Sequence, residues 1–376
     1  MRIGILVLSV GSSGQRKFYN LQEIGLAKAL DAYCEKVRVW RLVPHGEDAC
    51  SEKIAGYKNV TIEFLPSRCI GTNGFMDCSK LDRDLDALIC FADTQVTVPM
   101  IYRWAKRNKV LFLPYIGVVQ SHSTKAMRQK IINALFARNL RVYRKSCCLA
   151  KTPDVEAELR KQGISQIIVA PVGLDRTLLK PDYEQYGSEE IKEKYGFQKR
   201  DRIILFIGRL TEEKQPLRMV KLFAYIFERD KDFRLLMVGT GEQGDNVAEV
   251  IEAYNLGERV RRIERISNSE IWEIYRFSEV FVNLNQQEIF GMAILEAMYY
   301  GCKVVAWKAP GPDFIIENGI SGWIVENEEQ LLCRVLEENE ESRSDFMIVN
   351  ARKRIIRDFT WDSIVQKILL YIREAS

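Results

Sequence analysis

The sequence predicts an α/β protein built from two doubly wound, parallel-sheet domains that face each other across a cleft. Three observations predict this fold class. The chain has 376 residues, which is too many for a single hydrophobic core. Short apolar runs alternate with segments of helical periodicity, and this alternation builds parallel sheets that are covered on both faces. The alternation begins again near Arg202, so the whole pattern occurs twice.

The first series of elements occupies residues 1–170. Its strands are expected at 2–9, 37–42, 60–65, 87–91, 110–115, 147–151 and 167–170. Its helices are expected at 19–30, 98–107, 125–143 and 154–162. Residues 171–199 contain Pro181, Gly187 and many charges, so we expect them to form the connection between the two domains.

The second series follows the same alternation. Its strands are expected at 203–207, 233–238, 259–263, 279–284, 303–306 and 322–325. Its helices are expected at 215–228, 245–254, 268–277, 291–300 and 328–339, and two further helices at 343–357 and 361–374 close the chain. We therefore place an N-terminal domain at 1–180 and a C-terminal domain at 181–360. Ligands of such sheets bind where the strands end at their carboxyl termini.

The composition indicates a globular protein of the cytoplasm. Apolar residues make up 47% of the chain and charged residues 28%, which leaves little room for disorder or low complexity. Nine cysteines form an odd set without metal-ligand spacing, so we interpret them as reduced packing residues. The first apolar run is too short for a secretory signal, and no run of eighteen apolar residues occurs.

The charge is unevenly distributed along the chain. Residues 1–185 hold 28 basic and 18 acidic side chains, or +10, whereas residues 186–376 hold 27 and 33, or −6. Between Asp93 and Asp154 there are twelve basic residues and no acidic one. This segment predicts an anionic partner, either a membrane surface bound through 125–145 or an anionic or lipid-linked acceptor. The structural alternative is a helix surface that is merely soluble and basic; no nucleic-acid partner is expected.

Three local signals for a ligand or metal are weak on their own. Gly14 closes a glycine-containing loop between the first strand and a helix, which suits an anion but also an ordinary turn. Asp82, Asp84 and Asp86 have the spacing of a divalent-metal pair, yet they precede a strand, so solvated carboxylates are the favoured interpretation. His122 lies after the strand 110–115, on the ligand side of its sheet, where it could contact a sugar.

Gly239, Gly241 and Gly244 form a GxGxxG pattern, with Glu264 twenty residues further on. On paper this matches the fingerprint of a dinucleotide-binding site. The fingerprint belongs after the first strand of its domain, however, and here it follows the second. An NAD-dependent dehydrogenase that uses Gly239–Gly244 therefore stays an alternative interpretation.

The densest group of polar residues follows strands of the second series. Arg209 and Lys214 lie on the loop that leaves the strand 203–207, and Glu288 precedes a helix that contains Glu296. Two cations can stabilise a leaving diphosphate without a metal, aided by free N–H groups at the helix start near Phe290. Carboxylates bind the vicinal hydroxyls of a sugar or ribose. The structural alternative for Glu296 is an exposed helix residue, although its apolar neighbours indicate a buried helix, where an unpaired carboxylate is costly.

The order of these residues resembles the family-4 retaining glycosyltransferases of the GT-B fold. The shared pattern is Gly-Arg-Leu at 208–210, then Lys214, Gly-x-Gly at 239–241, and Glu-x-Phe-Gly from Glu288 with a second carboxylate at Glu296. The resemblance covers essentially the whole C-terminal domain. It also explains Gly239–Gly244 as a family loop that needs no nicotinamide.

The resemblance implies a role for each matching residue. Arg209 and Lys214 would bind the donor diphosphate, Glu296 the ribose, and Glu288 the hydroxyls of the donor sugar. The further donor-side contacts that it implies are Gly14, Gly208, Gly241, and the backbone of Phe290, Gly291 and Met292.

In the N-terminal domain the resemblance is weaker. The family commonly has a His-Gly pair after the strand equivalent to 110–115, where this chain has Ile116 and Gly117. His122 lies nearby and is a candidate replacement that would contact the acceptor or the sugar. The resemblance also implies that the closing helix, within 361–376, packs back on the N-terminal domain.

Together these observations predict a retaining hexosyltransferase that needs no metal or other cofactor. The expected donor is a nucleotide diphosphate sugar carrying a hexose or N-acetylhexosamine, with UDP as the expected nucleotide. The expected acceptor is a lipid-linked or surface-polysaccharide precursor, and the expected location is the cytoplasm or the inner face of the membrane. A non-catalytic subunit that binds a sugar nucleotide is the other alternative.

Overall fold

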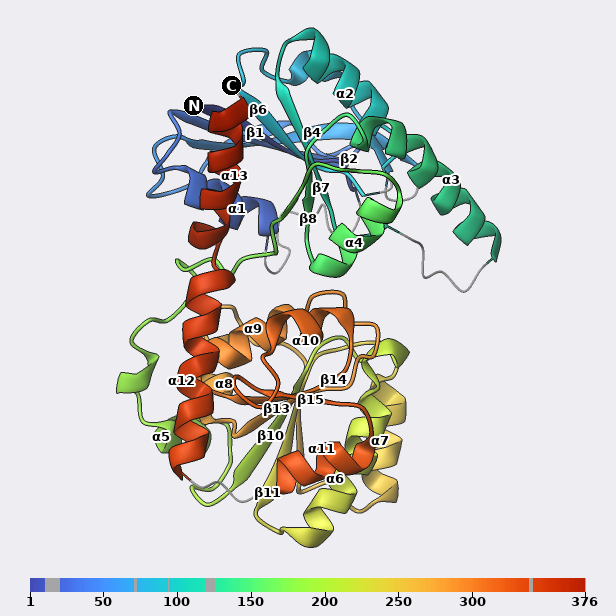
Figure 1. The fold of residues 1–376 in the computed structure, drawn as a ribbon. Helices are drawn as coiled ribbons and strands as arrows, with labels where there is room; N and C mark the ends of the chain where they lie inside the picture. Colours follow the sequence, from blue (N-terminus) through green and yellow to red (C-terminus); the bar gives the residue numbers. More distant parts are fainter. Residues whose placement is uncertain (11–20, 71–72, 94, 120–125, 338–340, 376) are drawn as a thin grey trace. The chain divides into compact units, whose positions relative to one another are not determined.

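The computed structural model describes residues 1–10, 21–70, 73–93, 95–119, 126–337 and 341–375. The described chain separates into two compact units (Figure 1). Unit 1 comprises Met1–Gly173 together with Trp361–Ser376, and unit 2 comprises Leu174–Thr360. Each unit is a parallel α/β sheet with helices on its faces, which confirms the predicted fold class.

Unit 1 contains a nine-stranded sheet, counted over the described residues, in the order β3-β4-β2-β1-β6-β7-β8-β9, with β5 paired to β4. Its strands are β1 (Arg2–Val7), β2 (Lys36–Pro44), β3 (Cys50–Lys53), β4 (Val60–Ile70), β5 (Asn73–Phe75), β6 (Ala87–Phe91), β7 (Leu111–Ile116), β8 (Cys148–Ala150) and β9 (Ile167–Val169). Its helices are α1 (Gln22–Leu30), α2 (Val98–Arg107), α3 (Ala126–Tyr143), α4 (Pro153–Lys161), α13 (Trp361–Ala375) and the short η2 (Cys78–Lys80). β3 and β5 are antiparallel additions to β4 that the sequence pattern missed.

Unit 2 contains a six-stranded parallel sheet, again over the described residues, in the order β12-β11-β10-β13-β14-β15. Its strands are β10 (Arg202–Ile207), β11 (Phe233–Val238), β12 (Val260–Ile263), β13 (Val280–Asn283), β14 (Lys303–Trp307) and β15 (Trp323–Val325). Its helices are α5 (Ser188–Lys194), α6 (Pro216–Arg229), α7 (Gly244–Ala253), α8 (Ile271–Phe277), α9 (Met292–Tyr299), α10 (Pro310–Ile315), α11 (Glu328–Leu336) and α12 (Glu341–Asp358), with the short η3 (Tyr183–Gln185) and η4 (Glu212–Lys214).

The elements form where local sequence and burial agree. In β1 the residues Ile3, Ile5 and Leu6 are all buried, as expected of a central parallel strand covered on both faces. α4 begins after Thr152, whose side chain accepts a hydrogen bond from the Val155 N–H, and Pro153 occupies the first helical position. Such local signals place each element at its point in the chain.

The boundary between the units lies earlier than the sequence indicated. The prediction set it at 180/181, whereas the units divide between Gly173 and Leu174. The reason is that the intervening segment packs within unit 2, where the Leu174 N–H donates to the Phe359 carbonyl and the Lys180 N–H donates to the Tyr300 hydroxyl.

The stretch predicted as an interdomain connection is largely structured. Within 171–199 the helix α5 packs against α8, and the Tyr195 hydroxyl donates to a carboxylate oxygen of Glu273 at 2.8 Å. The run of charges at 189–194 therefore belongs to a short helix. In unit 1, the closing helix α13 packs against α1.

The cysteines fall into three groups, of which Cys50 and Cys78 form the half-buried one. Cys34, Cys90, Cys147, Cys148 and Cys302 are buried, as expected of packing residues, and burial raises the pKa of the Cys34 thiol to about 11. Cys69 and Cys333 are exposed, so for these two the packing interpretation is wrong. Among the described residues no helix has the length and apolar character needed to cross a membrane.

Candidate functional site

The predicted donor residues lie at the carboxyl edge of the unit 2 sheet. The strand order places β10 beside β13, so the chain leaves neighbouring strands in opposite directions at this point. Open α/β sheets bind ligands in the crevice at such a switch point. The loop after β10 carries Arg209 and Lys214, and the loop after β13 carries Glu288.

Lys214 and Glu288 form an ion pair at this switch point. The Lys214 Nζ lies 2.6 Å from Glu288 Oε2, although the two residues are 74 positions apart in the sequence. Their side chains are 24% and 14% exposed, so the pair is largely shielded from solvent yet remains reachable. The side-chain amides of Asn283 and Asn285 also donate to Oε2, at 3.4 and 3.3 Å. The Glu288 carboxylate is therefore held by a cation and two amides.

Arg209 lies in a different environment from Lys214. Its side chain is 76% exposed, and its Nη2 lies 3.2 Å from Glu213 on the same loop. An exposed pair of this kind contributes little to stability. The guanidinium is therefore available to a ligand at small energetic cost.

Close backbone packing requires glycine in the loop after β11, which contacts the loop after β10. A Cβ atom on Gly239, whose φ is +142°, would lie 1.9 Å from the Gly208 carbonyl oxygen. A Cβ on Gly241 would lie 2.4 Å from the Leu210 oxygen. The two loops are also joined by the hydrogen bond from the Leu210 N–H to the Thr240 carbonyl. Backbone packing thus explains Gly-x-Gly at 239–241.

The loop after β13 turns sharply into α9. Gly291 has a φ of +96° and directly precedes Met292, the first residue of α9, while the Phe290 side chain is buried. The Gly311 N–H donates to the Glu288 carbonyl at 2.8 Å. The start of α9 leaves backbone N–H groups without partners inside the helix, and such groups suit an anion.

Glu296 is buried in α9 and not an exposed helix residue, so the structural alternative is wrong. It is 8% exposed, and the Tyr275 hydroxyl donates to Glu296 Oε2 at 2.9 Å. Tyr275 comes from α8 and is fully buried. This hydrogen bond offsets part of the cost of placing a carboxylate in an apolar helix.

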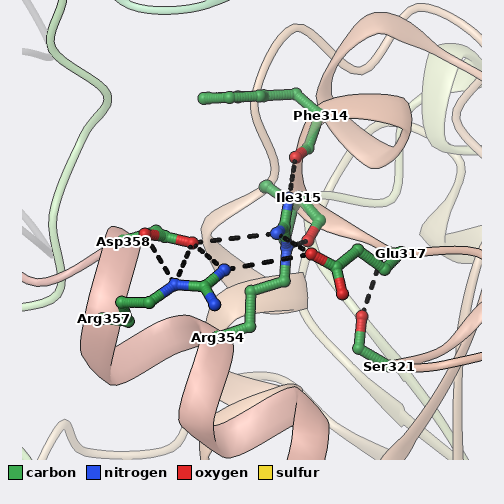
Figure 2. Close-up of polar contacts among 7 residues, drawn as sticks. All are labelled: Phe314, Ile315, Glu317, Ser321, Arg354, Arg357 and Asp358. Carbon is green, nitrogen blue, oxygen red and sulfur yellow. Dashed lines mark hydrogen bonds and ion pairs between the residues drawn. The ribbon is translucent and has the colours of Figure 1, made fainter.

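Arg354 of α12 fixes the far end of the neighbouring helix α10, as Figure 2 shows. Its Nε donates to the Ile315 carbonyl at 2.6 Å, its Nη2 to the Phe314 carbonyl at 2.9 Å, and its Nη1 to Glu317. A cation that satisfies the last carbonyls of a helix stabilises that end. α10 begins at Pro310, beside the Gly311 contact to the Glu288 loop, so Arg354 supports that loop indirectly.

The other predicted residues belong to the N-terminal part of the chain. Gly14 and His122 fall outside the described residues. Asp82 and Asp84 form ion pairs with the Lys36 ammonium at 2.7 and 3.4 Å, and Asp86 accepts a hydrogen bond from the Arg2 backbone N–H. Asp82 and Asp84 therefore neutralise cations on β1 and β2, and Asp86 holds the backbone at the start of β1. In the described part of the chain, no group of three or more His, Cys, Asp or Glu residues could hold a metal ion.

Sequence reasoning missed Asn283, Asn285 and Tyr275. The two asparagines stand at the end of β13, and polar residues at the end of a buried strand are the signal that could have identified them. Tyr275 carried no signal, because its hydroxyl meets Glu296 only through the packing of α8 against α9.

Comparisons with known proteins agree with this geometry. Residues 187–354 match the family model described as "Glycosyl transferases group 1". The α-monoglucosyldiacylglycerol synthase of Acholeplasma laidlawii is 21% identical over 201 residues, which are 52% of this chain and 50% of that protein. The chain spans about half the length of the curated relatives it matches.

Two solved structures share the fold. The sucrose-phosphate synthase of Thermosynechococcus elongatus matches with a TM-score of 0.75 at 18% identity, over 100% of this chain and 99% of that one. HepE of Anabaena, solved in complex with UDP, matches with a TM-score of 0.72 at 16% identity over 100% of both chains. The resemblance seen in the sequence is thereby confirmed: residues 187–354 match the glycosyl transferases group 1 family, and the whole chain shares the fold of these two structures.

Proposed function

We propose that this protein is a retaining glycosyltransferase that transfers a hexose or N-acetylhexosamine from a UDP-sugar. The Lys214–Glu288 pair carries the proposal, because it places a cation and a hydroxyl-binding carboxylate together at the switch point of the unit 2 sheet. The UDP complex of HepE supports the choice of nucleotide. The match of residues 187–354 to the glycosyl transferases group 1 family supports the reaction class.

The residues at the site would have distinct roles in binding the donor and in sugar transfer. Arg209 and Lys214 would stabilise the negative charge that grows on the diphosphate as the bond from the sugar C1 to the phosphate oxygen breaks. Glu288 would bind sugar hydroxyls, and Glu296, held by Tyr275, would bind the ribose. The acceptor oxygen would bond to C1 on the same face, and its proton would pass to the leaving phosphate. No side-chain base is then required.

The direct test measures donor hydrolysis and transfer across a panel of UDP-, GDP- and ADP-sugars. We expect turnover of UDP-sugars, full activity in EDTA and no gain from added Mg²⁺ or Mn²⁺, because Arg209 and Lys214 would neutralise the diphosphate in place of a metal. Activity that EDTA abolishes and Mn²⁺ restores would contradict metal independence. Binding of NADH without binding of any sugar nucleotide would favour a dehydrogenase instead.

We further propose a lipid-linked acceptor reached through α3. The start of this helix projects from unit 1 (Figure 1), and Met127 and Ile131 on it are 77% and 56% exposed. Its later apolar residues Phe136 and Leu140 pack into the core, so only the first half offers an apolar surface. Exposed basic side chains accompany it at Lys130, Arg138, Arg141, Arg144 and Lys145. The lipid-glycosylating relative supports the same acceptor class.

Vesicle flotation tests this attachment. Each basic side chain near an anionic surface contributes about 1 kcal/mol, so reversing Lys130, Arg141 and Lys145 to glutamate should weaken binding by roughly a hundredfold or more. Arg138 and Arg144 are left in place because they donate to the carbonyls of Val96 and Gln162.

The matched control reverses Arg103, Lys106 and Arg107, which are exposed on α2 of the same unit. This variant should still float with vesicles rich in anionic lipid. If both variants were released equally, vesicle binding would depend on net charge and not on α3. Wild-type protein that does not bind anionic vesicles at low salt would contradict the membrane proposal.

A further inference from the structure

The carboxyl edge of the unit 1 sheet has a switch point of its own, between β1 and β6. Lys151 directly follows β8 at this edge, and its N–H still donates to the Ile116 carbonyl of β7 at 3.0 Å. Its ammonium lies 5.6 Å from the ring centroid of Phe91 and 5.2 Å from that of Tyr115. The side chain thus crosses the ends of β7 and β6 toward the switch point.

Gly117 makes room for this path. A Cβ atom on Gly117 would lie 2.7 Å from Lys151 Cδ and 3.2 Å from its Nζ. Ile116, the residue that replaces the histidine of the resemblance, is completely buried and is unable to contact a substrate. At this edge of the sheet the Lys151 ammonium is therefore a polar group that could contact a substrate in place of that histidine.

The carboxylates near Lys151, Glu23 and Asp93, have other partners, although Glu23 still attracts the ammonium electrostatically. Its Nζ donates to Gln22 Oε1 at 3.3 Å, and among the described residues no carboxylate lies within ion-pair distance of it. The nearby Glu23 carboxylate pairs with the buried Arg41 at 3.0 Å, while burial raises the pKa of Glu23. Asp93 accepts hydrogen bonds from the N–H groups of Gly117 and Val118. Among the described residues, the direct contacts of this half-buried ammonium are an amide oxygen and two rings, so it favours an added anion.

The start of α1 strengthens the same preference. Gln22 is the first residue of this nine-residue helix, and the side chain of the N-cap residue Leu21 makes no capping hydrogen bond. The helix start and the ammonium meet through the Lys151–Gln22 hydrogen bond. The positive end of a helix dipole favours nearby phosphate oxygens.

We propose that Lys151 binds an oxyanion of the acceptor, of the phosphate-ester class, at the carboxyl edge of the unit 1 sheet. This inference rests on the proposed function, because it names the acceptor chemistry of the same reaction. Lysine is a compact charge with three donors, which suits the oxygens of a phosphate group. The phosphate belongs either to a small soluble acceptor or to a lipid head group.

Amine-reactivity mapping tests the site directly. The full-length protein, with the donor site filled by UDP, is acylated under limiting reagent, and the modification of each lysine is quantified by mass spectrometry. Inorganic phosphate should slow acylation of Lys151 at least severalfold and leave Lys28 unaffected. Lys28 is the matched internal control because its ammonium also lies over a ring in unit 1, 5.8 Å from Tyr57. Unchanged reactivity of Lys151 would overturn the proposal.

Variants of Lys151 and Gly117 test separately the charge of Lys151 and the position of its side chain. Lys151→Met should weaken phosphate binding, measured by calorimetry in saturating UDP, by at least tenfold, and Lys151→Arg should recover part of it. Gly117→Ala should weaken binding while keeping the lysine, since the new methyl group displaces its side chain. Lys28→Met should bind phosphate as the wild type does. Equal affinity in Lys151→Met and Lys28→Met would overturn the proposal.

Two probes distinguish the sources of the phosphate. Protection of Lys151 by glycerol 1-phosphate supports a soluble acceptor, and protection only by vesicles that contain phosphatidic acid supports a lipid head group. A separate measurement tests the proposed function. Wild-type protein that does not bind UDP would contradict the assignment of UDP as the donor nucleotide. The protection of Lys151 by phosphate is then measured without UDP.

Discussion

Replacing Lys214 by alanine is expected to lower kcat/KM for sugar transfer by roughly a hundredfold, which corresponds to about 3 kcal/mol of lost transition-state stabilisation. The ammonium lies 2.6 Å from Glu288, so its removal takes away the cation proposed to stabilise the diphosphate and also the partner of the carboxylate proposed to bind the sugar. We expect kcat to fall more than UDP affinity, because charge on the phosphate grows as the bond breaks. Steady-state kinetics and calorimetry with UDP measure the two quantities.

The matched control is Lys308→Ala. Lys308 also belongs to unit 2 and forms an ion pair of 2.5 Å, with Glu326, but it lies outside the loops that follow β10 and β13. The Lys308→Ala variant should transfer sugar at the wild-type rate. Near-normal kcat/KM in Lys214→Ala, with intact thermal unfolding, would remove Lys214 from the site.

Arg209→Ala is expected to lower transfer in the same direction. The Arg209 guanidinium is largely exposed and pairs only with its loop neighbour Glu213 among the contacts seen, so its loss should leave folding stability unchanged. Any fall in kcat/KM then reports the loss of a ligand contact. Unchanged kinetics at every donor concentration would exclude this role.

Gly311→Ala is expected to destabilise unit 2 by about 3 kcal/mol and to abolish UDP binding, since overpacking against fixed backbone costs this much or more. A Cβ atom on Gly311 would lie 2.3 Å from the Phe290 carbonyl oxygen and 2.7 Å from its carbonyl carbon. The neighbouring backbone is unable to yield locally, because the Gly311 N–H is bonded to the Glu288 carbonyl. The loop that carries Glu288 must therefore move.

Chemical denaturation and UDP calorimetry measure the two effects. Gly257→Ala is the matched control, because nothing lies within 4 Å of a Cβ built on Gly257 and its backbone conformation is an ordinary one. That variant should bind UDP normally and unfold at or slightly above the wild-type midpoint. Wild-type affinity in Gly311→Ala would show that the loop position is irrelevant to donor binding.

Much of the fold could be predicted because its signals are local. The apolar runs that became β10 and β11 and the periodic segment that became α6 are each readable within a short window. The misread stretch shows the limit of such windows. α5 is seven residues long and rich in charge, and it is stabilised by contacts with α8, which lies more than seventy residues further along the chain. Packing energy of this kind leaves no periodic trace in the segment itself.

The sequence by itself determined the fold class, the repeated strand–helix order and the residue types of the donor site, because Gly-Arg-Leu, Lys214 and the Glu288–Glu296 spacing are contiguous patterns. Only the tertiary structure decided which of these side chains meet. Lys214 reaches Glu288 because β10 and β13 are neighbours in the sheet, and Tyr275 reaches Glu296 because α8 packs on α9. Lys151 was one of twelve equivalent cations in the sequence. Its position over Gly117, without a carboxylate at ion-pair distance in the described chain, depends on the order of four strands, and strand order is set by long-range burial rather than by any local pattern.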